Sequence, residues 1–251
     1  MPMRSARRLA SVAVVASLAV AGLSACRSAP SVAAYLGDTT ITESRVTDVY
    51  NEVYDAVSAT PPPKGEAVPM PITRMDVARV LVSAEILPIV AKQHNVSLPA
   101  TVPVDDYASA LSIPPGTEYA KLFAESDTLT TLLRQNATTQ PQLTDTDLRE
   151  VYDALVTSGQ IPANTPFDQF KSALPADNTQ AVQSAVAVRN EIAEVTSAMT
   201  ISINPRYQPM AIPVLLFQTQ QKEVRALVSA PIGANDASVP VSAAPGAAAA
   251  S

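Results

Sequence analysis

The chain has 251 residues, of which 23 are acidic and 17 are basic, so its formal net charge is −6 at pH 7. A net negative chain is repelled by nucleic acid and by anionic lipid headgroups, which argues against electrostatic partners of either kind. One cysteine allows no intrachain disulfide and no multi-cysteine metal site, and the absence of tryptophan, with 7 glycines and 22 prolines, predicts aliphatic helices joined by stiff connections.

The first 25 residues have the layout of a secretory signal peptide. A positively charged start, Met1–Arg8, is followed by an uncharged apolar run over Leu9–Leu23 that is too short for a comfortable transmembrane helix. The run ends in Leu-Ser-Ala-Cys, with the cysteine at Cys26. This ending resembles the lipobox of bacterial lipoproteins, in which the cysteine sulfur receives a diacylglyceryl group and the chain is cut just before it.

A lipid anchor at Cys26 is chemically reasonable, because a thiolate is readily alkylated to a stable thioether. Two acyl chains hold a protein durably on a membrane, whereas a single chain binds only marginally. We therefore expect residues 1–25 to be a signal peptide and residues 26–31 to be a lipidated tether on the extracytoplasmic face of the cell membrane. The alternative is a plain secretory peptide cut near Ala25, which leaves a free thiol.

The first predicted helix has the clearest periodicity in the chain. Residues 32–36 predict a short strand, and a turn at Gly37–Thr39 precedes a helix over 43–58. Thr42 is a good N-cap, with Glu43 in the first turn, where a negative charge meets the helix dipole favourably. The apolar residues at helical spacing are Val46, Val49, Tyr50, Val53, Tyr54 and Val57.

A second helix is expected after a proline-rich, exposed loop over Thr60–Pro71. Thr73 and Asp76 have the spacing of a capping box, and the apolar residues that follow occupy most of the helix circumference. This pattern predicts a central, largely buried helix. Pro88 should kink or interrupt it, because proline removes a backbone donor and clashes with the preceding turn. His94 closes the helix.

Shorter elements are predicted in the rest of the chain. Residues 97–117 should be mostly irregular, with one short turn around residues 105–111. A strand is expected at Thr200–Ile203, and Ile212–Phe217 is a candidate for a further extended segment. The remaining helices are expected over 118–135, from Thr144 to Gly159, over 167–174 and over 179–199.

Three segments together resemble a known pattern. Residues 34–43 place a strand and a turn before a helix that begins after an Ile-Thr pair. Residues 143–152 start a helix with Leu-Thr-Asp, and residues 201–207 predict a short strand that ends at Asn-Pro. In this order and spacing they resemble SurA-type periplasmic chaperones and their PrsA-like lipoprotein relatives. The closing strand is similar to that of actinobacterial members.

The resemblance implies a mainly α fold, with a SurA-like chaperone module of about five to six helices over residues 32–207. A small two-stranded β element is expected to join the N- and C-terminal ends of this module. Residues 208–228 follow as a C-terminal extension. The Ala, Pro, Ser and Gly composition of residues 229–251 predicts a disordered tail.

The chain departs from these families in one respect. A parvulin peptidyl-prolyl isomerase domain usually follows the Thr-Asp helix, but here only residues 157–166 separate that helix from the next. A domain needs roughly 50 residues or more, so this segment is too short to hold one. The resemblance therefore does not imply isomerase activity.

The sequence offers little for catalysis. His94 is the chain's one histidine and lies at a helix end, where the dipole alone favours it, and Asp105 and Asp106 lie in a polar, proline-bearing segment. Asp145 and Asp147 are spaced like acidic ligands of a metal site, but no glycine or downstream glutamate completes a calcium loop. Helix capping explains these two residues better. We expect no enzyme activity, no cofactor and no metal site.

A surface that binds polypeptides is the functional hypothesis that remains. Five apolar residues on amphipathic helices are candidates for lining a groove: Tyr50, Tyr54, Tyr119, Leu122 and Phe123. The alternative is that they are ordinary core residues. The first hypothesis is a chaperone-like holdase for unfolded exported polypeptides, and the second is a non-catalytic envelope scaffold lipoprotein that binds one specific protein partner.

Overall fold

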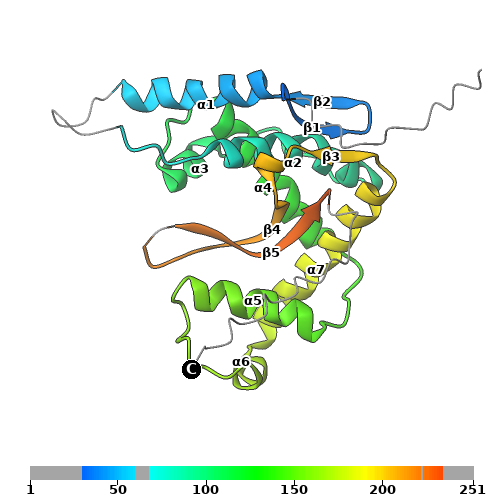
Figure 1. Cartoon of the computed structure of the whole chain (residues 1–251). Coiled ribbons are helices and arrows are strands. Elements are labelled where there is room, and N and C mark those ends of the chain that lie inside the picture. The colour runs from blue at the N-terminus through cyan, green and yellow to red at the C-terminus, as the bar shows by residue number, and fades with distance from the viewer. Residues whose placement is uncertain (1–29, 60–67, 222, 234–251) are drawn as a thin grey trace, which may run out of the picture.

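The computed structural model describes residues 30–59, 68–221 and 223–233. In this part of the chain the protein is mainly helical, with seven α-helices, one small three-stranded sheet and one β-hairpin (Figure 1). The predicted signal peptide, Cys26 and the first residues of the tether lie outside the described residues. Most of the proline-rich loop and residues 234–251 of the predicted tail lie outside them as well.

The three-stranded sheet joins the two ends of the helical module. Strand β1 (Val32–Leu36) pairs antiparallel with β2 (Thr39–Thr42) and also with β3 (Ile201–Ile203), in the order β2-β1-β3. Gly37 turns the chain between β1 and β2 with φ of +60°, a conformation that glycine adopts without steric cost. The predicted meeting of the N-terminal strand with the C-terminal segment is confirmed, but the sheet has three strands rather than two, because Thr39–Thr42 pairs back.

Helix α1 (Glu43–Ser58) has the predicted bounds and cap. The Thr42 side chain accepts a hydrogen bond from the Arg45 N–H group at 3.1 Å, which satisfies one of the unpaired donors at the helix start. The side chains of Val46, Val49 and Val53 are fully or almost fully buried, and α1 packs against α2. The periodic pattern therefore identified the buried valines of this helix, but it also included Tyr54, which is 43% exposed.

Helix α2 (Arg74–Gln93) is the central helix, as predicted. Thr73 and Asp76 form the reciprocal capping box, and the helix packs against α1, α4 and α7. The predicted interruption at Pro88 is wrong, since the helix continues to Gln93. Pro88 and Ile89 are exposed, while Ile86, Leu87 and Val90 are buried and hold the helix in place.

Two helices follow on one side of α2. Helix α4 (Glu118–Asn136) matches the prediction, but α3 (Val104–Leu111) is a helix of two turns where the sequence predicted a mostly irregular segment with one turn. Ala108 of α3 is fully buried, and the Tyr107 ring lies edge-on to the Phe123 ring of α4. Packing against α4 therefore stabilises a helix whose local signals are weak.

The last three helices complete the helical part of the fold: α5 and α6 contact each other, and α7 packs along the hairpin. Helix α5 (Asp145–Thr157) begins at the predicted Thr144 cap, and α6 (Phe167–Ala173) is the predicted short helix. Helix α7 (Ala176–Ser197) begins three residues before the predicted start and leads to β3. Its buried face packs against α2, α4 and the hairpin.

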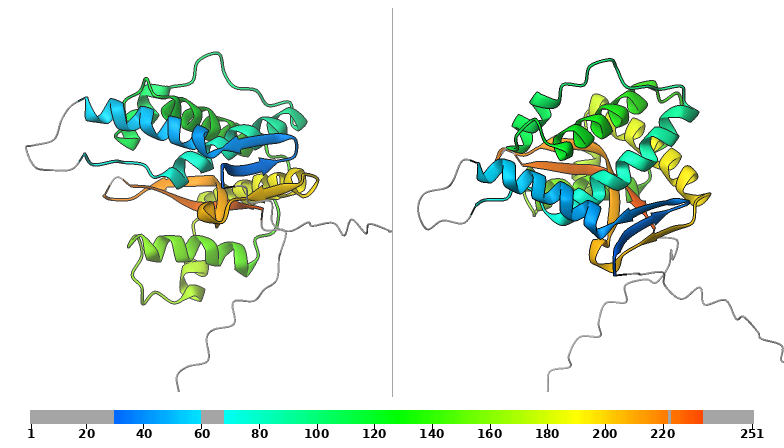
Figure 2. Two further views of the ribbon diagram at one scale, coloured as in Figure 1. Left: turned by 45° about the horizontal axis from the view of Figure 1, so that its top comes forward. Right: turned by 90° about the horizontal axis from the view of Figure 1, so that it is seen from above.

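A β-hairpin forms the centre of the molecule. A short 3₁₀ turn, η1 (Pro205–Tyr207), leads from β3 into β4 (Met210–Gln218), which pairs antiparallel with β5 (Val224–Ile232). Figure 1 and the left view of Figure 2 show this hairpin between helices α1–α4 on one side and the pair α5–α6 on the other. The prediction of an extended segment at Ile212–Phe217 is confirmed.

Two boundaries predicted near the C-terminus are wrong. Residues 208–228 are no separate extension, and the predicted tail starts too early, because Ser229 to Ile232 belong to β5. Ile212 and Ala230 face each other in the hairpin register, and both are buried, as is Ile232. The Ala- and Pro-rich composition hid a strand whose small side chains fit a tightly packed position.

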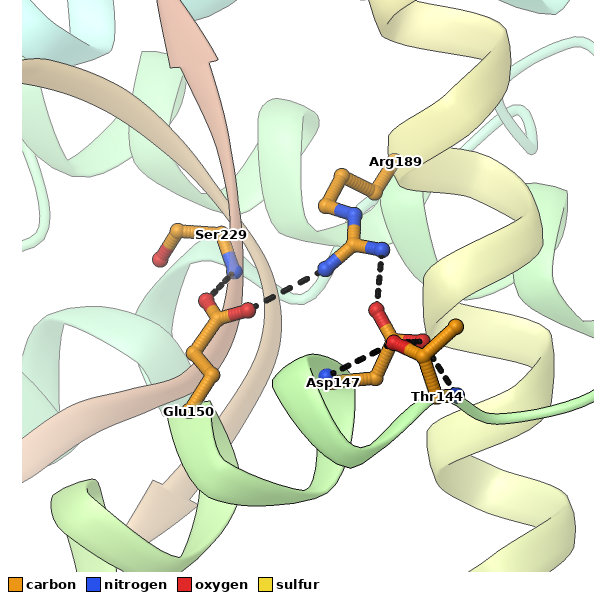
Figure 3. A network of polar contacts seen from close by, with 5 residues as sticks. All are labelled: Thr144, Asp147, Glu150, Arg189 and Ser229. Atoms are coloured by element: carbon orange, nitrogen blue, oxygen red, sulfur yellow. Dashed lines mark hydrogen bonds and ion pairs between the residues drawn. The ribbon is translucent and has the colours of Figure 1, made fainter. Parts of the chain in front are cut away.

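A polar network fixes α5 to α7 and to the hairpin (Figure 3). Arg189 of α7 binds Asp147 of α5 through one guanidinium nitrogen and Glu150 through the other, the latter at 3.2 Å. Glu150 also accepts a hydrogen bond from the backbone N–H of Ser229 in β5 at 2.9 Å. Thr144 donates both its backbone N–H and its hydroxyl to Asp147, so this buried carboxylate caps α5 while it pairs with Arg189.

The network makes the stability of the fold depend on pH. Burial alone raises the pKa of Asp147, but the hydrogen bonds from Thr144 and Arg189 outweigh it and hold the pKa below its ordinary value. A carboxyl group with a lower pKa in the folded chain contributes stability that is complete above the unfolded pKa. That stability is lost as the pH falls through the folded pKa, here below about pH 4.

Replacing Asp147 with Asn should lower the unfolding free energy at pH 7 by about 1.5–3 kcal/mol, the range for hydrogen bonds to charged groups. The difference from the wild type should narrow below about pH 4, where the wild-type carboxyl group becomes protonated. Urea unfolding at several pH values measures it. Asp145→Asn is the control, since Asp145 is exposed and pairs with Lys171 at the surface. If the difference in unfolding free energy between Asp147→Asn and the wild type stayed constant with pH, the lowered pKa of Asp147 would be contradicted.

Candidate functional site

A cleft of about 900 Å³ lies beside the hairpin. Helices α2 and α4 and the end of α3 form one wall, β4 and β5 form the other, and the last turns of α5 border it. A volume of this size lies within the usual range for pockets that bind small molecules or short peptide segments. The cleft therefore exists because the hairpin is held between two groups of helices.

Two aromatic rings of α4, Tyr119 and Phe123, line the helical side of the cleft and form what we call its aromatic wall. The rings of Tyr119 and Phe123, one turn apart on α4, are stacked with centroids 6.2 Å apart, and Tyr107 of α3 lies edge-on to Phe123 at 6.0 Å. Such ring pairs hold each other's orientation. Across the cleft, Ile212 and Leu216 of β4 supply aliphatic side chains. Phe123 and Leu216 are half-buried, so both present apolar surface to a ligand in the cleft.

Charged groups lie among these apolar residues. Asp76 pairs with Arg79 at 2.7 Å, and this pair lies on α2. The second ion pair, Glu223 with Arg225, lies on the hairpin, also at 2.7 Å. Both arginines of the cleft are therefore neutralised by a carboxylate of the cleft itself.

Asp127 and Tyr107 form a hydrogen bond behind the aromatic wall. The Tyr107 hydroxyl donates to Asp127 at 2.8 Å. Burial, and next the hydrogen bond to the Asp127 carboxylate, raise the pKa of Tyr107 to about 12. Tyr107 therefore stays protonated at physiological pH and acts as a fixed donor, which orients the Asp127 carboxylate at the edge of the cleft.

The structure brings together two of the five predicted groove residues. Tyr119 and Phe123 both line the cleft, although Tyr119 is only 4% exposed and is mainly a core residue. Leu122 is half-buried against the core and does not line the cleft. Tyr50 lies under the guanidinium of Arg74 at 4.9 Å.

Tyr54 is 43% exposed on α1 and lies outside the cleft. Cys26, the predicted lipid attachment site, lies outside the described residues. The residues on the hairpin side of the cleft, Leu216 above all, were not predicted from the sequence. No local signal marked that residue, because its role depends on where the hairpin packs.

The other polar residues considered from the sequence have structural roles. His94 lies 3.3 Å from Glu191 of α7, so it links the end of α2 to α7, and Asp105 and Asp106 occupy the first turn of α3. Burial raises the pKa of Glu191 above its ordinary value, while His94 opposes this shift. Within the described ranges, no three His, Cys, Asp or Glu side chains lie close enough together to hold a metal ion.

Comparison with known proteins finds no family model, no curated protein and no solved structure that matches this chain. The likeness to SurA-type chaperones therefore rests on the three sequence segments alone. No helix in the described part of the chain is long and apolar enough to cross a bilayer.

The burial of these aromatic residues predicts how much each contributes to stability. Tyr119→Ala should lower the unfolding free energy by about 3–5 kcal/mol, because it leaves a cavity in the core. Phe123→Ala should cost less, since its ring is only partly buried. Tyr54→Ala should stay within about 0.5 kcal/mol of the wild type, as for an exposed side chain. Urea unfolding checks the order, and equal costs for the three would contradict the division into core, cleft and surface.

Proposed function

We propose that the protein is a lipid-anchored, extracytoplasmic holdase that binds extended segments of unfolded exported polypeptides in the cleft, without isomerase activity. The observation that carries this proposal is the cleft itself, with an aromatic wall on α4 and an aliphatic wall on β4. Exposed apolar side chains are what an unfolded chain offers and a folded chain hides. A concave apolar surface with scattered polar groups suits such segments.

The position of the cleft relative to the predicted anchor supports the same proposal. Val32 is the first residue of β1 and follows Cys26 by six residues, which can span at most about 20 Å. The β1–β3 sheet lies at one end of the molecule, and α3 and the hairpin tip lie at the other (Figures 1 and 2). An anchor at Cys26 holds the sheet near the membrane and leaves α3 and the hairpin tip at the far end of the molecule.

Aggregation of a chemically denatured model enzyme tests the proposal. The assay uses residues 26–251 with Cys26→Ser, so that no lipid is attached. Suppression at stoichiometric excess should be well above that of an acidic control protein of similar size. Phe123→Ala removes the more exposed ring of the aromatic wall, and Ala110→Trp fills the cleft from an exposed position at the end of α3. Both should lose most of the suppression, whereas Tyr54→Ala should keep it.

Each outcome has a distinct meaning. No suppression by the wild type would refute the holdase function and favour a scaffold lipoprotein that binds one specific envelope protein. In a pull-down from envelope extract, that scaffold gives one stoichiometric partner, while a holdase gives many weakly bound clients. Suppression that survives both cleft variants would place the binding surface elsewhere.

A further inference from the structure

We propose that the cleft selects polypeptide segments in which lysine or arginine lies next to apolar residues. The proposal rests on the proposed function, since it specifies which segments the same cleft binds. The observation behind it is the uneven distribution of charge around the cleft, where carboxylates outnumber guanidinium groups.

Four carboxylates and two guanidinium groups line the cleft. The guanidinium groups belong to Arg79 and Arg225, and each is paired with a neighbouring carboxylate of the same wall. Two carboxylates, Asp127 and Asp153, remain without an ion pair among the described residues. The cleft therefore has an excess of two negative charges that no cation of the described chain neutralises by direct contact.

The two excess carboxylates lie on different helices that line the cleft. Asp127 follows Phe123 by one helical turn on α4, so the two side chains share a helix face. Asp153 lies on α5, at the border that faces the hairpin. When a bound polypeptide places an apolar side chain on Phe123, a lysine or arginine next to it in the polypeptide can therefore reach the Asp127 carboxylate.

Both carboxylates are able to accept further hydrogen bonds. Asp127 receives one bond, from Tyr107, and an ionised carboxylate has about four acceptor sites. Asp153 is exposed and forms no hydrogen bond or ion pair with another described side chain. Arg134, two turns further along α4, donates to Thr131 and forms no ion pair with Asp127. Its partly buried charge offsets that of Asp127 only from a distance.

The charge of the whole chain acts in the same direction. Three of the 17 basic residues and none of the 23 acidic residues lie in the predicted signal peptide, so 14 basic residues remain after its removal, and the net charge is about −9. A negative protein attracts basic segments and repels acidic ones during diffusional encounter. The cleft carboxylates add selectivity at the site of binding, beyond this general attraction.

Three labelled peptides test the selectivity. They have the same length and the same apolar residues, and they carry two Lys, two Gln or two Glu at the same positions. Fluorescence anisotropy with residues 26–251 carrying Cys26→Ser should give the tightest binding for the Lys peptide and the weakest for the Glu peptide. The differences should shrink at high salt, because exposed charges are screened.

Substitutions separate the cleft carboxylates from the overall charge. Asp153→Asn and Asp127→Asn should each weaken binding of the Lys peptide about twofold to fivefold, the range for partly exposed ion pairs, and leave the Gln peptide unchanged. Asn at position 127 still accepts the hydrogen bond from Tyr107. Asp55→Asn removes the same charge from an exposed position on α1 outside the cleft and should have no such effect.

Failure of this inference is distinguishable from failure of the proposed function. Equal affinity for the three peptides, or equal weakening by Asp55→Asn and the two cleft variants, would overturn the selectivity while the cleft still binds polypeptides. If none of the peptides binds, both proposals are wrong.

Discussion

The pairing of β1 on both edges is the constraint on which the cleft depends. Asn204, directly after β3, donates its backbone N–H to Ala33 and its side-chain amide to Val32, both at 2.9 Å, while the Tyr207 hydroxyl donates to Glu43 of α1 at 2.7 Å. These contacts close a loop that contains all seven helices of the described chain, at an entropic cost that rises slowly with loop length. Because β4 follows within a few residues, this closure places the hairpin between the helices and forms the second wall of the cleft.

The fold could be predicted from the sequence where the signal is local. The capping boxes at Thr73 and Thr144 and the apolar stripe of α1 set helix starts and inward faces within the helices themselves. Helix α3 and strand β5 could not be found in this way. Their stability comes from Ala108 packed against α4 and from Ala230 and Ile232 packed in the hairpin, and a single sequence does not show which distant segments supply those contacts.

The candidate site could be predicted only in part, for a related reason. Tyr119 and Phe123 were found because a helix presents apolar residues at regular spacing, but the same rule also selected Tyr54, which faces solvent on α1. Leu216 and Asp153 were not found, since each becomes part of the cleft through the position of its whole element. A helical periodicity identifies an apolar face and does not show what covers it.

Hydrogen–deuterium exchange, with and without an unfolded client protein, tests the central claim most directly. Because the cleft is bounded by α2, the end of α3, α4, the β4–β5 hairpin and the last turns of α5, amides of these elements should exchange more slowly when the client is bound. Exchange on the outer face of α1 around Tyr54 should not change. Protection confined to α1, or no protection in any element, would contradict the assignment of the cleft as the binding site.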